Sequence, residues 1–476
     1  MSYNAYVTTL KNLRPHPNAD RLQLAECFGN TICVSLDYTP EQIGIYFPTD
    51  GQLSEEFAIQ NNLIRRKDEN GNNIGGYMDP EKRNVKAIKL RGEKSDGLFL
   101  PLSCLDYCYP DINGGAAVML NIGDTVNVIN GHEICRKYIP KVNPNKVREY
   151  DGKSKKKKAK KLNIAPLFDE HKDTEQLAYN LAAFRSGDLI EITRKLHGTS
   201  GRTSHTKVLK GFKRSLLDKI LFREGTPIYD WGYASGTRRT ILDSYEGGFY
   251  GSNKFREQYH NMFVGKLLKG ETVYYEIVGF IDNGTPIMGI CNNKKLNDKE
   301  FLKKYGETTT FSYGCSPDGL SEPLAYWDEA ETEPAMYKKL PQSDMYVYRM
   351  TMTNEDGDVV EYTPDYMRYR CEQMGIKTVP VHWYGFIPDE EIFTGVSCEF
   401  TNPGEFVLEK AEEFYDGEEP IDPTHIREGV VVRIINRPTF TAYKHKNFTF
   451  KVLEGIIKET AEAPDMEEAD GLENNE

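Results

Sequence analysis

The chain has no long apolar segment and few residues that could cross-link it. No apolar run approaches the roughly twenty residues needed to span a membrane, and the polar N-terminus does not resemble a signal peptide. The nine cysteines are scattered, and the closest pair, Cys104 and Cys108, has no second pair at zinc-finger spacing. These absences predict a cytoplasmic protein with reduced thiols, no structural zinc and no membrane segment.

The net charge of the chain excludes fewer classes of partner than these absences do. The formal net charge is -12, which is unusual for an enzyme that binds nucleic acid. The last sixteen residues, 461–476, carry seven acids and no Lys or Arg, and removing them leaves a net charge of -5. We therefore predict an acidic disordered tail over 459–476, and local patches must decide which partners the chain binds.

A second biased segment lies inside the chain. Residues 153–161 contain seven lysines. Such a block repels itself and stays solvated, so it predicts a Lys-rich linker over 146–164. Two other interpretations stay open, because the same lysines could hold a phosphate backbone or serve as a nuclear address.

The chain divides by its patterns on either side of this run. At 476 residues it is long enough for two or three domains. Residues 1–145 contain short β-prone runs, such as 31–36 and 43–47, between turns rich in Pro, Asn, Asp and Gly, which favours a small β-barrel. Residues 254–268 have an apolar side chain every four residues, which predicts an amphipathic helix packed on a sheet.

Residues 194–201, Arg-Lys-Leu-His-Gly-Thr-Ser-Gly, say most about chemistry. They follow the alternating run 189–193, which predicts a strand that leads into a loop. A lysine amine attacks phosphorus only when it is unprotonated and held in line, and Lys195 at a strand end could meet both conditions. Gly198 would allow the backbone to approach a nucleotide closely. By itself this spacing is weak, because a solvated lysine beside a turn glycine gives the same pattern.

Three more segments follow in order: 274–279 with Glu276, 427–433 with Glu428, and 443–446, Tyr-Lys-His-Lys. Together with the lysine segment they resemble the ordered motifs of the covalent nucleotidyltransferases, the superfamily of ATP-dependent RNA and DNA ligases and mRNA capping enzymes. DNA ligases and capping enzymes usually carry aspartate where this chain has His197. The histidine makes the motif most similar to that of RNA ligases.

The resemblance implies a role for each motif residue. Lys195 would capture AMP as a phosphoramidate, Glu276 would bind the ribose, and Glu428 would help to hold a divalent metal. Lys444 and Lys446 would face the α-phosphate. The residues make physical sense, because a carboxylate on an apolar strand is costly to bury unless it meets a hydroxyl, a cation or a metal. Lysines two residues apart on a strand also point to one side.

Weaker matches suggest three further residues. Arg238 resembles the family's arginine that reaches AMP or the incoming 5′-phosphate, with Arg239 as its rival. Tyr348 is our choice over Tyr346 for stacking on adenine, and core packing is the alternative for either ring. His197 could hydrogen-bond the phosphate or the leaving group, or be a packed loop residue.

The resemblance implies an α+β protein. A nucleotidyltransferase (ATP-grasp-like ligase) domain on antiparallel sheets would cover 165–458. An OB-like nucleic-acid-binding β-barrel would cover 1–145, whose segment 14–22 resembles tRNA-binding OB modules.

The implied reaction is ATP-dependent joining of 3′-OH and 5′-phosphate ends of RNA, with Mg²⁺ or Mn²⁺. The RNA could be a nicked duplex, a broken tRNA, a single strand or an RNA–DNA hybrid, and a compact repair enzyme would suit a virus or phage. A GTP-using capping enzyme, a DNA ligase and an inactive RNA-binding protein remain alternatives.

The first prediction concerns the nucleophile. Lys195→Ala and Lys195→Arg should both abolish a covalent adduct with ATP, because alanine lacks the amine and arginine is too basic and has the wrong shape to attack. Gel detection of radiolabel transferred from ATP measures this. Acid-labile label remaining on either variant would place the nucleophile elsewhere.

Overall fold

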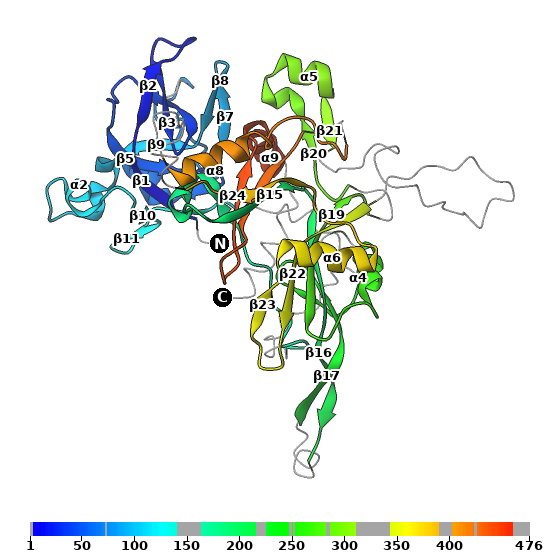
Figure 1. The fold of residues 1–476 in the computed structure, drawn as a ribbon. Coiled ribbons are helices and arrows are strands. Elements are labelled where there is room, and N and C mark those ends of the chain that lie inside the picture. Colours follow the sequence, from blue (N-terminus) through cyan, green and yellow to red (C-terminus); the bar gives the residue numbers. More distant parts are fainter. Residues whose placement is uncertain are drawn as a thin grey trace. The chain divides into compact units, whose positions relative to one another are not determined.

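The computed structural model divides the chain into two compact units (Figure 1). Unit 1 comprises Met1–Lys141, Asn292–Glu307 and Phe448–Ala461, and unit 2 comprises Val142–Cys291, Thr308–Asn447 and Glu462–Glu476. The lysine run 153–161 and the acidic residues 461–476 lie outside the described residues, so the linker and the tail stay predictions. The described residues are 3–71, 74–139, 163–215, 225–246, 250, 253–281, 286–310, 343–389, 402–422 and 426–459.

Unit 1 is built mainly from short antiparallel strands. The described strands form a four-stranded sheet in the order β10-β1-β5-β9, a three-stranded sheet β2-β3-β4, and the pairs β7-β8, β11-β12 and β13-β6. No closed sheet is found among them, so the OB-like barrel remains a prediction. The strands are β1 (Ala5–Thr9), β2 (Lys11–Pro15), β3 (Leu22–Cys27), β4 (Asn30–Ser35), β5 (Ile43–Phe47), β6 (Gly51–Leu53), β7 (Ala87–Leu90), β8 (Glu93–Asp96), β9 (Leu98–Pro101), β10 (Thr125–Val126), β11 (Val128–Ile129), β12 (His132–Glu133) and β13 (Cys135–Lys137).

A hydrophobic core of unit 1 lies where the four-stranded sheet meets short helices. Phe47 of β5 and Phe57 of α1 are fully buried in it, with ring centroids 5.4 Å apart. Ser54 caps α1 by accepting a hydrogen bond from the Phe57 amide. The helices of unit 1 are α1 (Glu55–Gln60), η1 (Leu102–Cys108), α2 (Gly115–Met119), η4 (Asn293–Leu296), α5 (Lys299–Tyr305) and α9 (Phe448–Glu459).

Unit 1 takes in two segments that the sequence analysis placed within 165–458. Helix α9 contacts β7 and η4, and Lys451 Nζ of α9 lies 2.6 Å from Asp96 Oδ2 at the end of β8. Lys89 Nζ of β7 lies 2.5 Å from Asp298 Oδ2, the N-cap of α5. A protein truncated near residue 163 would therefore leave α5 and α9 without the strands on which they pack.

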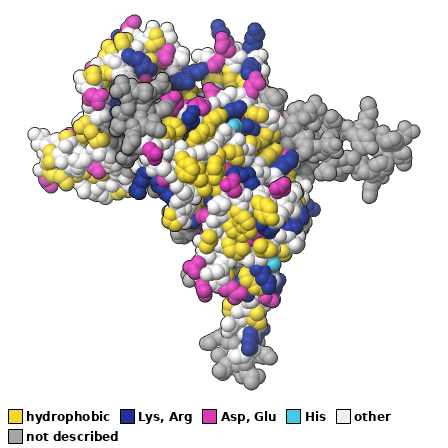
Figure 2. All heavy atoms as spheres, viewed as in Figure 1, with side chains coloured by type: hydrophobic (Ala, Val, Ile, Leu, Met, Phe, Trp, Pro, Cys, Tyr) yellow, Lys and Arg dark blue, Asp and Glu magenta, His cyan; other side chains and the backbone are white. Residues whose placement is uncertain are grey.

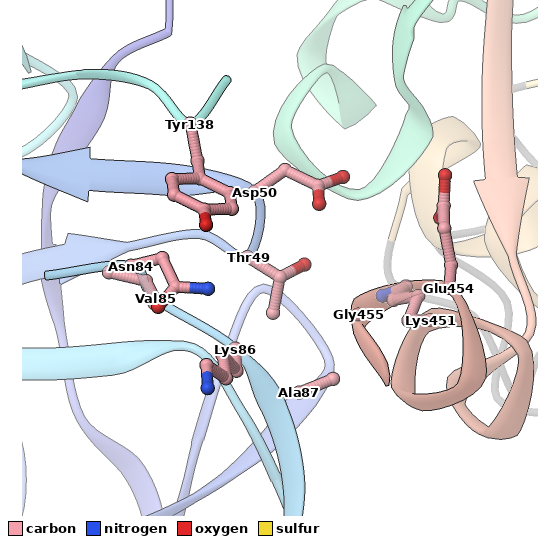
Figure 3. Close-up of a pocket in the computed structure, with 10 residues that line it drawn as sticks. All are labelled: Thr49, Asp50, Asn84, Val85, Lys86, Ala87, Tyr138, Lys451, Glu454 and Gly455. Carbon is pink, nitrogen blue, oxygen red and sulfur yellow. The ribbon is translucent and has the colours of Figure 1, made fainter. Parts of the chain in front are cut away.

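A small pocket lies between α9 and the strands of unit 1 (Figure 3). Lys451, Glu454 and Gly455 face it from α9. The opposite wall comes from three places in the segment 1–141. They are the residues before β6, the residues at and before the start of β7, and a residue after β13: Thr49, Asp50, Asn84, Val85, Lys86, Ala87 and Tyr138.

Unit 2 contains two larger sheets, which confirms the α+β class. One has the order β14-β26-β25-β15-β24 and the other the order β18-β17-β16-β19-β22-β23. All neighbours in them are antiparallel except β14 and β26. The strands are β14 (Glu175–Gln176), β15 (Leu189–Lys195), β16 (Thr199–Lys213), β17 (Thr226–Gly236), β18 (Ile241–Leu242), β19 (Glu271–Gly279), β22 (Ser343–Thr353), β23 (Val359–Glu361), β24 (Val381–Phe386), β25 (Gly429–Ile434) and β26 (Thr441–Lys446), and β20 (Ile290–Asn292) pairs with β21 (Thr308–Thr310).

The helix expected over 254–268 is shorter than its apolar pattern. It ends at Phe263, because Gly265 adopts a left-handed backbone with φ 81°. Leu267 is still buried, but from the loop that follows. The described helices of unit 2 are η2 (Leu177–Tyr179), η3 (Leu181–Ala183), α4 (Lys254–Phe263), α6 (Pro364–Met374) and α8 (Pro403–Glu412).

The described residues include no candidate membrane helix and no disulfide. None of their helices is both long and apolar enough to cross a membrane. The seven cysteines among them are free thiols, five of which belong to unit 1: Cys27, Cys33, Cys104, Cys108, Cys135, Cys291 and Cys371.

The ion pair of α9 gives a stability prediction. Asp96→Ala should lower the free energy of unfolding of unit 1 by about 3 kcal/mol, because it leaves the largely buried Lys451 ammonium without its carboxylate. Lys451→Ala should have a similar effect, and the double variant should cost less than the sum of the two. Urea titration followed by hydrogen exchange at α9 amides measures this. Strictly additive effects would contradict it.

Candidate active site

Three strands align Lys195 with Lys446 across a glycine. Lys195, the last residue of β15, is the cross-strand partner of Gly429 in β25, and Gly429 is in turn the partner of Lys446 in β26. Gly429 has φ 148°, and a Cβ atom there would lie 2.0 Å from the His445 carbonyl oxygen. Only glycine fits this position, so the Glu-Gly sequence brings the two lysines beside Glu428.

Glu428 is the centre of the site. Its Oε1 lies 2.9 Å from Lys195 Nζ and 3.3 Å from Lys446 Nζ, and its Oε2 lies 3.6 Å from His197 Nδ1. The side chain is 1% exposed. Burial alone would raise the pKa of Glu428, but the neighbouring lysines hold it well below its usual range. The site therefore contains a buried carboxylate that is ionised at neutral pH.

Glu276 is a second carboxyl near the same lysine. It lies on β19, paired with Ser200 of β16 and with Tyr346 of β22, and the Ser200 hydroxyl donates to Glu276 Oε2 at 3.3 Å. Burial raises the pKa of Glu276 to about 7, with Lys195 lowering it and the Glu428 charge raising it. The two carboxyl groups thus differ in protonation near neutral pH.

The loop after Lys195 packs directly on β19. A Cβ atom on Gly198 would lie 2.2 Å from the Ile277 carbonyl oxygen, which explains why the motif has glycine there. Arg256 of α4 holds the loop from the other side, because its guanidinium donates to the Ser200 carbonyl and to the Thr199 hydroxyl, each at 2.6 Å. Sequence reasoning missed Arg256, since it considered only the apolar residues of this helix.

Tyr348 occupies a β-bulge. Arg349 pairs with Tyr274 and Val347 pairs with Tyr275, so Tyr348 is the extra residue between them. Bulges redirect side chains and are common next to active sites. The Tyr348 hydroxyl lies 3.2 Å from His171 Nδ1, and the two rings meet edge to face at 5.5 Å.

The alternative ring, Tyr346, lies in the same apolar cluster. Tyr346 and Tyr348 both pack with Leu196 and Val278. Leu196 is the residue after Lys195, and Val278 lies near the end of β19. The Tyr346 hydroxyl donates to Asp344 Oδ2 at 3.1 Å. The cluster forms an apolar wall beside Lys195, and the choice between the two rings remains a prediction.

Both candidate arginines bind one carboxylate. Arg238 Nε lies 2.9 Å from Asp173 Oδ1, and Arg239 Nη2 lies 2.8 Å from Asp173 Oδ2. Burial would raise the pKa of Asp173, but Arg238 and then Arg239 lower it below its usual value. Burial, and after it the Arg238 charge, lowers the pKa of His171 to about 3, so this ring is neutral. The sequence showed no regular pattern here, so Asp173 and His171 were missed.

Lys444 lies on β26 as expected. It pairs with Val431 of β25 and with Gln176 of β14, two residues before Lys446 on the same strand. Tyr443 and His445, which alternate with the lysines, are buried. The predicted alternation of this strand is therefore present, and Lys446 is the lysine that contacts Glu428.

The carboxylates fit a metal that is bound together with a nucleotide. No group of three His, Cys, Asp or Glu side chains in the described part of the chain could hold a metal ion by itself. However, Glu428 Oε2 is buried and accepts no hydrogen bond from the described residues. Mg²⁺ is often held by one or two carboxylates, with phosphates and water as the other ligands. Glu428 could supply such a ligand.

Solved structures of Naegleria gruberi RNA ligase resemble this chain over nearly its whole length. A lysine-to-alanine variant with ATP and Mn is 15% identical, with a TM-score of 0.50, and the match covers 95% of this chain and 98% of that chain. A glutamate-to-alanine variant with ATP and Mn, also 15% identical, has a TM-score of 0.50 and coverages of 94% and 98%. An aspartate-to-alanine variant without ligand is 15% identical and has a TM-score of 0.50, and the match covers 95% of this chain and 98% of that chain.

No protein-family model and no curated protein matches the chain. The structural likeness shows that the chain has a mixed α+β fold like that of this RNA ligase.

The raised pKa of Glu276 gives a pH prediction. A carboxyl whose folded pKa exceeds its unfolded value, 4.5, stabilises the protein below that value, and this contribution is lost as pH rises through about 7. Relative to Glu276→Gln, the wild-type protein should therefore lose stability between about pH 5 and pH 8. Urea denaturation of both proteins across this range measures it. Parallel curves would contradict the raised pKa.

Proposed function

We propose that the protein is an ATP-dependent RNA ligase that joins 3′-OH and 5′-phosphate ends through a Lys195–AMP intermediate. The observation that carries this proposal is the row Lys195–Gly429–Lys446, with Lys195 Nζ 2.9 Å from the buried Glu428 carboxylate. Strand pairing fixes the amine at a strand end, beside a carboxylate and a second cation. A nucleophilic lysine for phosphoryl transfer needs this combination.

The first step forms one bond and breaks one. Lys195 Nζ, after losing a proton, attacks the α-phosphorus of ATP, so an N–P bond forms and the P–O bond to pyrophosphate breaks. Lys446 and Lys444 neutralise negative charge that develops on the departing group. A divalent cation at Glu428, Mg²⁺ or Mn²⁺, would add positive charge at the phosphates.

The next two steps use the RNA ends. An oxygen of the RNA 5′-phosphate attacks the lysine-bound phosphorus, which transfers AMP to the RNA and restores the Lys195 amine. The 3′-OH then attacks the 5′-phosphate and releases AMP. Arg238 is suited to the 5′-phosphate, because the guanidinium that now binds Asp173 can also bind a phosphate in a planar fork.

The nucleoside would lie against β19 and β22. Glu276 would accept a hydrogen bond from a ribose hydroxyl, Tyr348 would stack on adenine, and Gly198 would let the backbone approach the nucleotide. His197 would hydrogen-bond the phosphate or the leaving group. The ATP and Mn in the matched Naegleria gruberi ligase variants support the choice of nucleotide and metal.

The substrate is proposed to be RNA, as a nicked duplex, a broken tRNA or a single strand, or an RNA–DNA hybrid. An OB-like module within residues 1–145 would hold it ahead of the transferase domain. A cytoplasmic location is proposed with this function, and the lysine run 153–161 keeps a nuclear address open.

Label transfer from two nucleotides tests the reaction class. Wild-type protein is incubated with Mg²⁺ and labelled ATP or labelled GTP, and then with a nicked duplex whose 3′-OH strand ends in ribonucleotides. An adduct from ATP with sealing supports the RNA ligase. An adduct from GTP would support a capping enzyme, and sealing of DNA alone would support a DNA ligase. No adduct would support a binding protein.

The charged residues proposed to act at the phosphates give a prediction for the same adduct assay. Glu428→Ala, Lys444→Ala and Lys446→Ala should each reduce adduct formation about a hundredfold or more, because each removes one charge at the phosphates. Lys410→Ala is the control, since that lysine of α8 pairs with Glu413 at the end of the helix and should leave the rate unchanged. Near-normal rates in both β26 variants would move the phosphate site away from this strand.

A further inference from the structure

Strands β16 and β17 form a two-stranded ribbon that extends beyond the sheet of unit 2 (Figure 1). β19 pairs with β16 from Thr199 to Ser204, whereas β17 pairs with β16 as far as Lys213. None of the residues assigned to the candidate active site lies on the ribbon from 205 to 213. A long ribbon is not needed to place Lys195, so its surface calls for a separate explanation.

One face of the ribbon carries a ladder of aromatic rings. His205 pairs with Tyr233, and Lys207 pairs with Trp231, so these four side chains share a face. The His205 and Tyr233 rings stack at 4.5 Å with an interplanar angle of 17°, and the His205 and Trp231 rings meet edge to face at 5.8 Å. All four side chains are partly exposed.

Two lysines converge on the tryptophan of this ladder. Lys207 Nζ lies 4.6 Å from the Trp231 ring centroid, and Lys269 Nζ, from the loop after α4, lies 5.5 Å from it. Cation–π contacts hold ammonium groups without neutralising them, so the two like charges repel each other. Glu355 is 3.6 Å from Lys207, but it is 68% exposed, and such surface pairs contribute little. An anion between the lysines would relieve the repulsion.

The rest of the ribbon is also basic. Its described residues, 205–215 and 225–233, include four Lys or Arg and one Asp, in a chain whose net charge is -12. Lys210, Lys213 and Arg214 are exposed. Lys and Arg side chains lie along this part of unit 2 in Figure 2, with some acidic groups nearby. A local excess of cations beside partly exposed rings is the surface that nucleic acid strands bind.

We propose that this face, defined by His205, Lys207, Trp231, Tyr233 and Lys269, binds the backbone of the RNA substrate outside the active site. The proposal rests on the proposed function. Lys207 and Lys269 contact phosphates, and the ring ladder offers a stacking surface for an unpaired base. An RNA strand fits better than an acidic peptide, because the rings match base faces as well as the lysines match phosphates.

Removing the two ammonium groups tests the proposal. Lys207→Gln with Lys269→Gln should weaken binding of a nicked RNA duplex about tenfold at about 0.1 M salt, and should lower the slope of log affinity against log salt by about 1.8, or 0.9 for each phosphate contact. Fluorescence anisotropy measures both. Adduct formation with ATP should stay unchanged, because neither lysine belongs to the candidate active site.

A charge-matched control separates a site from net charge. Lys303→Gln with Lys410→Gln removes the same charge from α5 and α8 and should change RNA affinity less than twofold. Equal loss in both double variants, or unchanged affinity in the ribbon variant, would overturn the proposal. Lys269→Gln alone, in an exposed loop position, repeats the test if the double variant unfolds. Absence of an adduct in the wild-type protein would refute the ligase function. The RNA affinities would still show whether the ribbon binds RNA.

Discussion

The structure of the candidate site depends on one buried charge, the Glu428 carboxylate. A carboxylate at 1% exposure needs cations close by, and strand pairing supplies Lys195 and Lys446 from the strands on either side. Gly429 makes this possible, since any side chain there would collide with the His445 carbonyl. The same three strands therefore fix Lys195 and satisfy the carboxylate, so the stability of the site and the position of this amine rest on the same contacts.

A second set of contacts holds the segment after Lys195 against the other sheet. The loop after Lys195 lies on β19 because Gly198 has no Cβ, and Arg256 ties its backbone to α4. Glu276 and Tyr348 then reach the site from neighbouring strands of the other sheet. The two carboxyl groups differ in environment. Glu428 lies beside the ammonium groups of Lys195 and Lys446. Glu276 accepts a hydrogen bond from the Ser200 hydroxyl and is influenced by the charge of Lys195. That difference separates their pKa values.

The motif residues could be predicted because each lies on a short strand whose alternation is visible in sequence. The structure brings Lys195, Glu276, Glu428 and Lys446 together, and their roles stay predictions. The sequence pattern did not predict Arg256, His171 or Asp173. Arg256 is a buried polar residue on a helix whose pattern marks only apolar positions, and His171 and Asp173 lie in an irregular segment without a repeating pattern. The grouping of α9 with the N-terminal strands also depends on long-range contacts, such as Lys451 with Asp96, that no local pattern reveals.

Peptide mapping of the adenylylated protein tests the central claim most directly. The protein is incubated with ATP and Mg²⁺, digested under conditions that preserve the phosphoramidate, and the modified peptide is sequenced by mass spectrometry. The structure predicts one AMP on Lys195, and none on Lys446 although it touches the same carboxylate. AMP on Lys446, or on a lysine remote from Glu428, would contradict the assignment of the nucleophile.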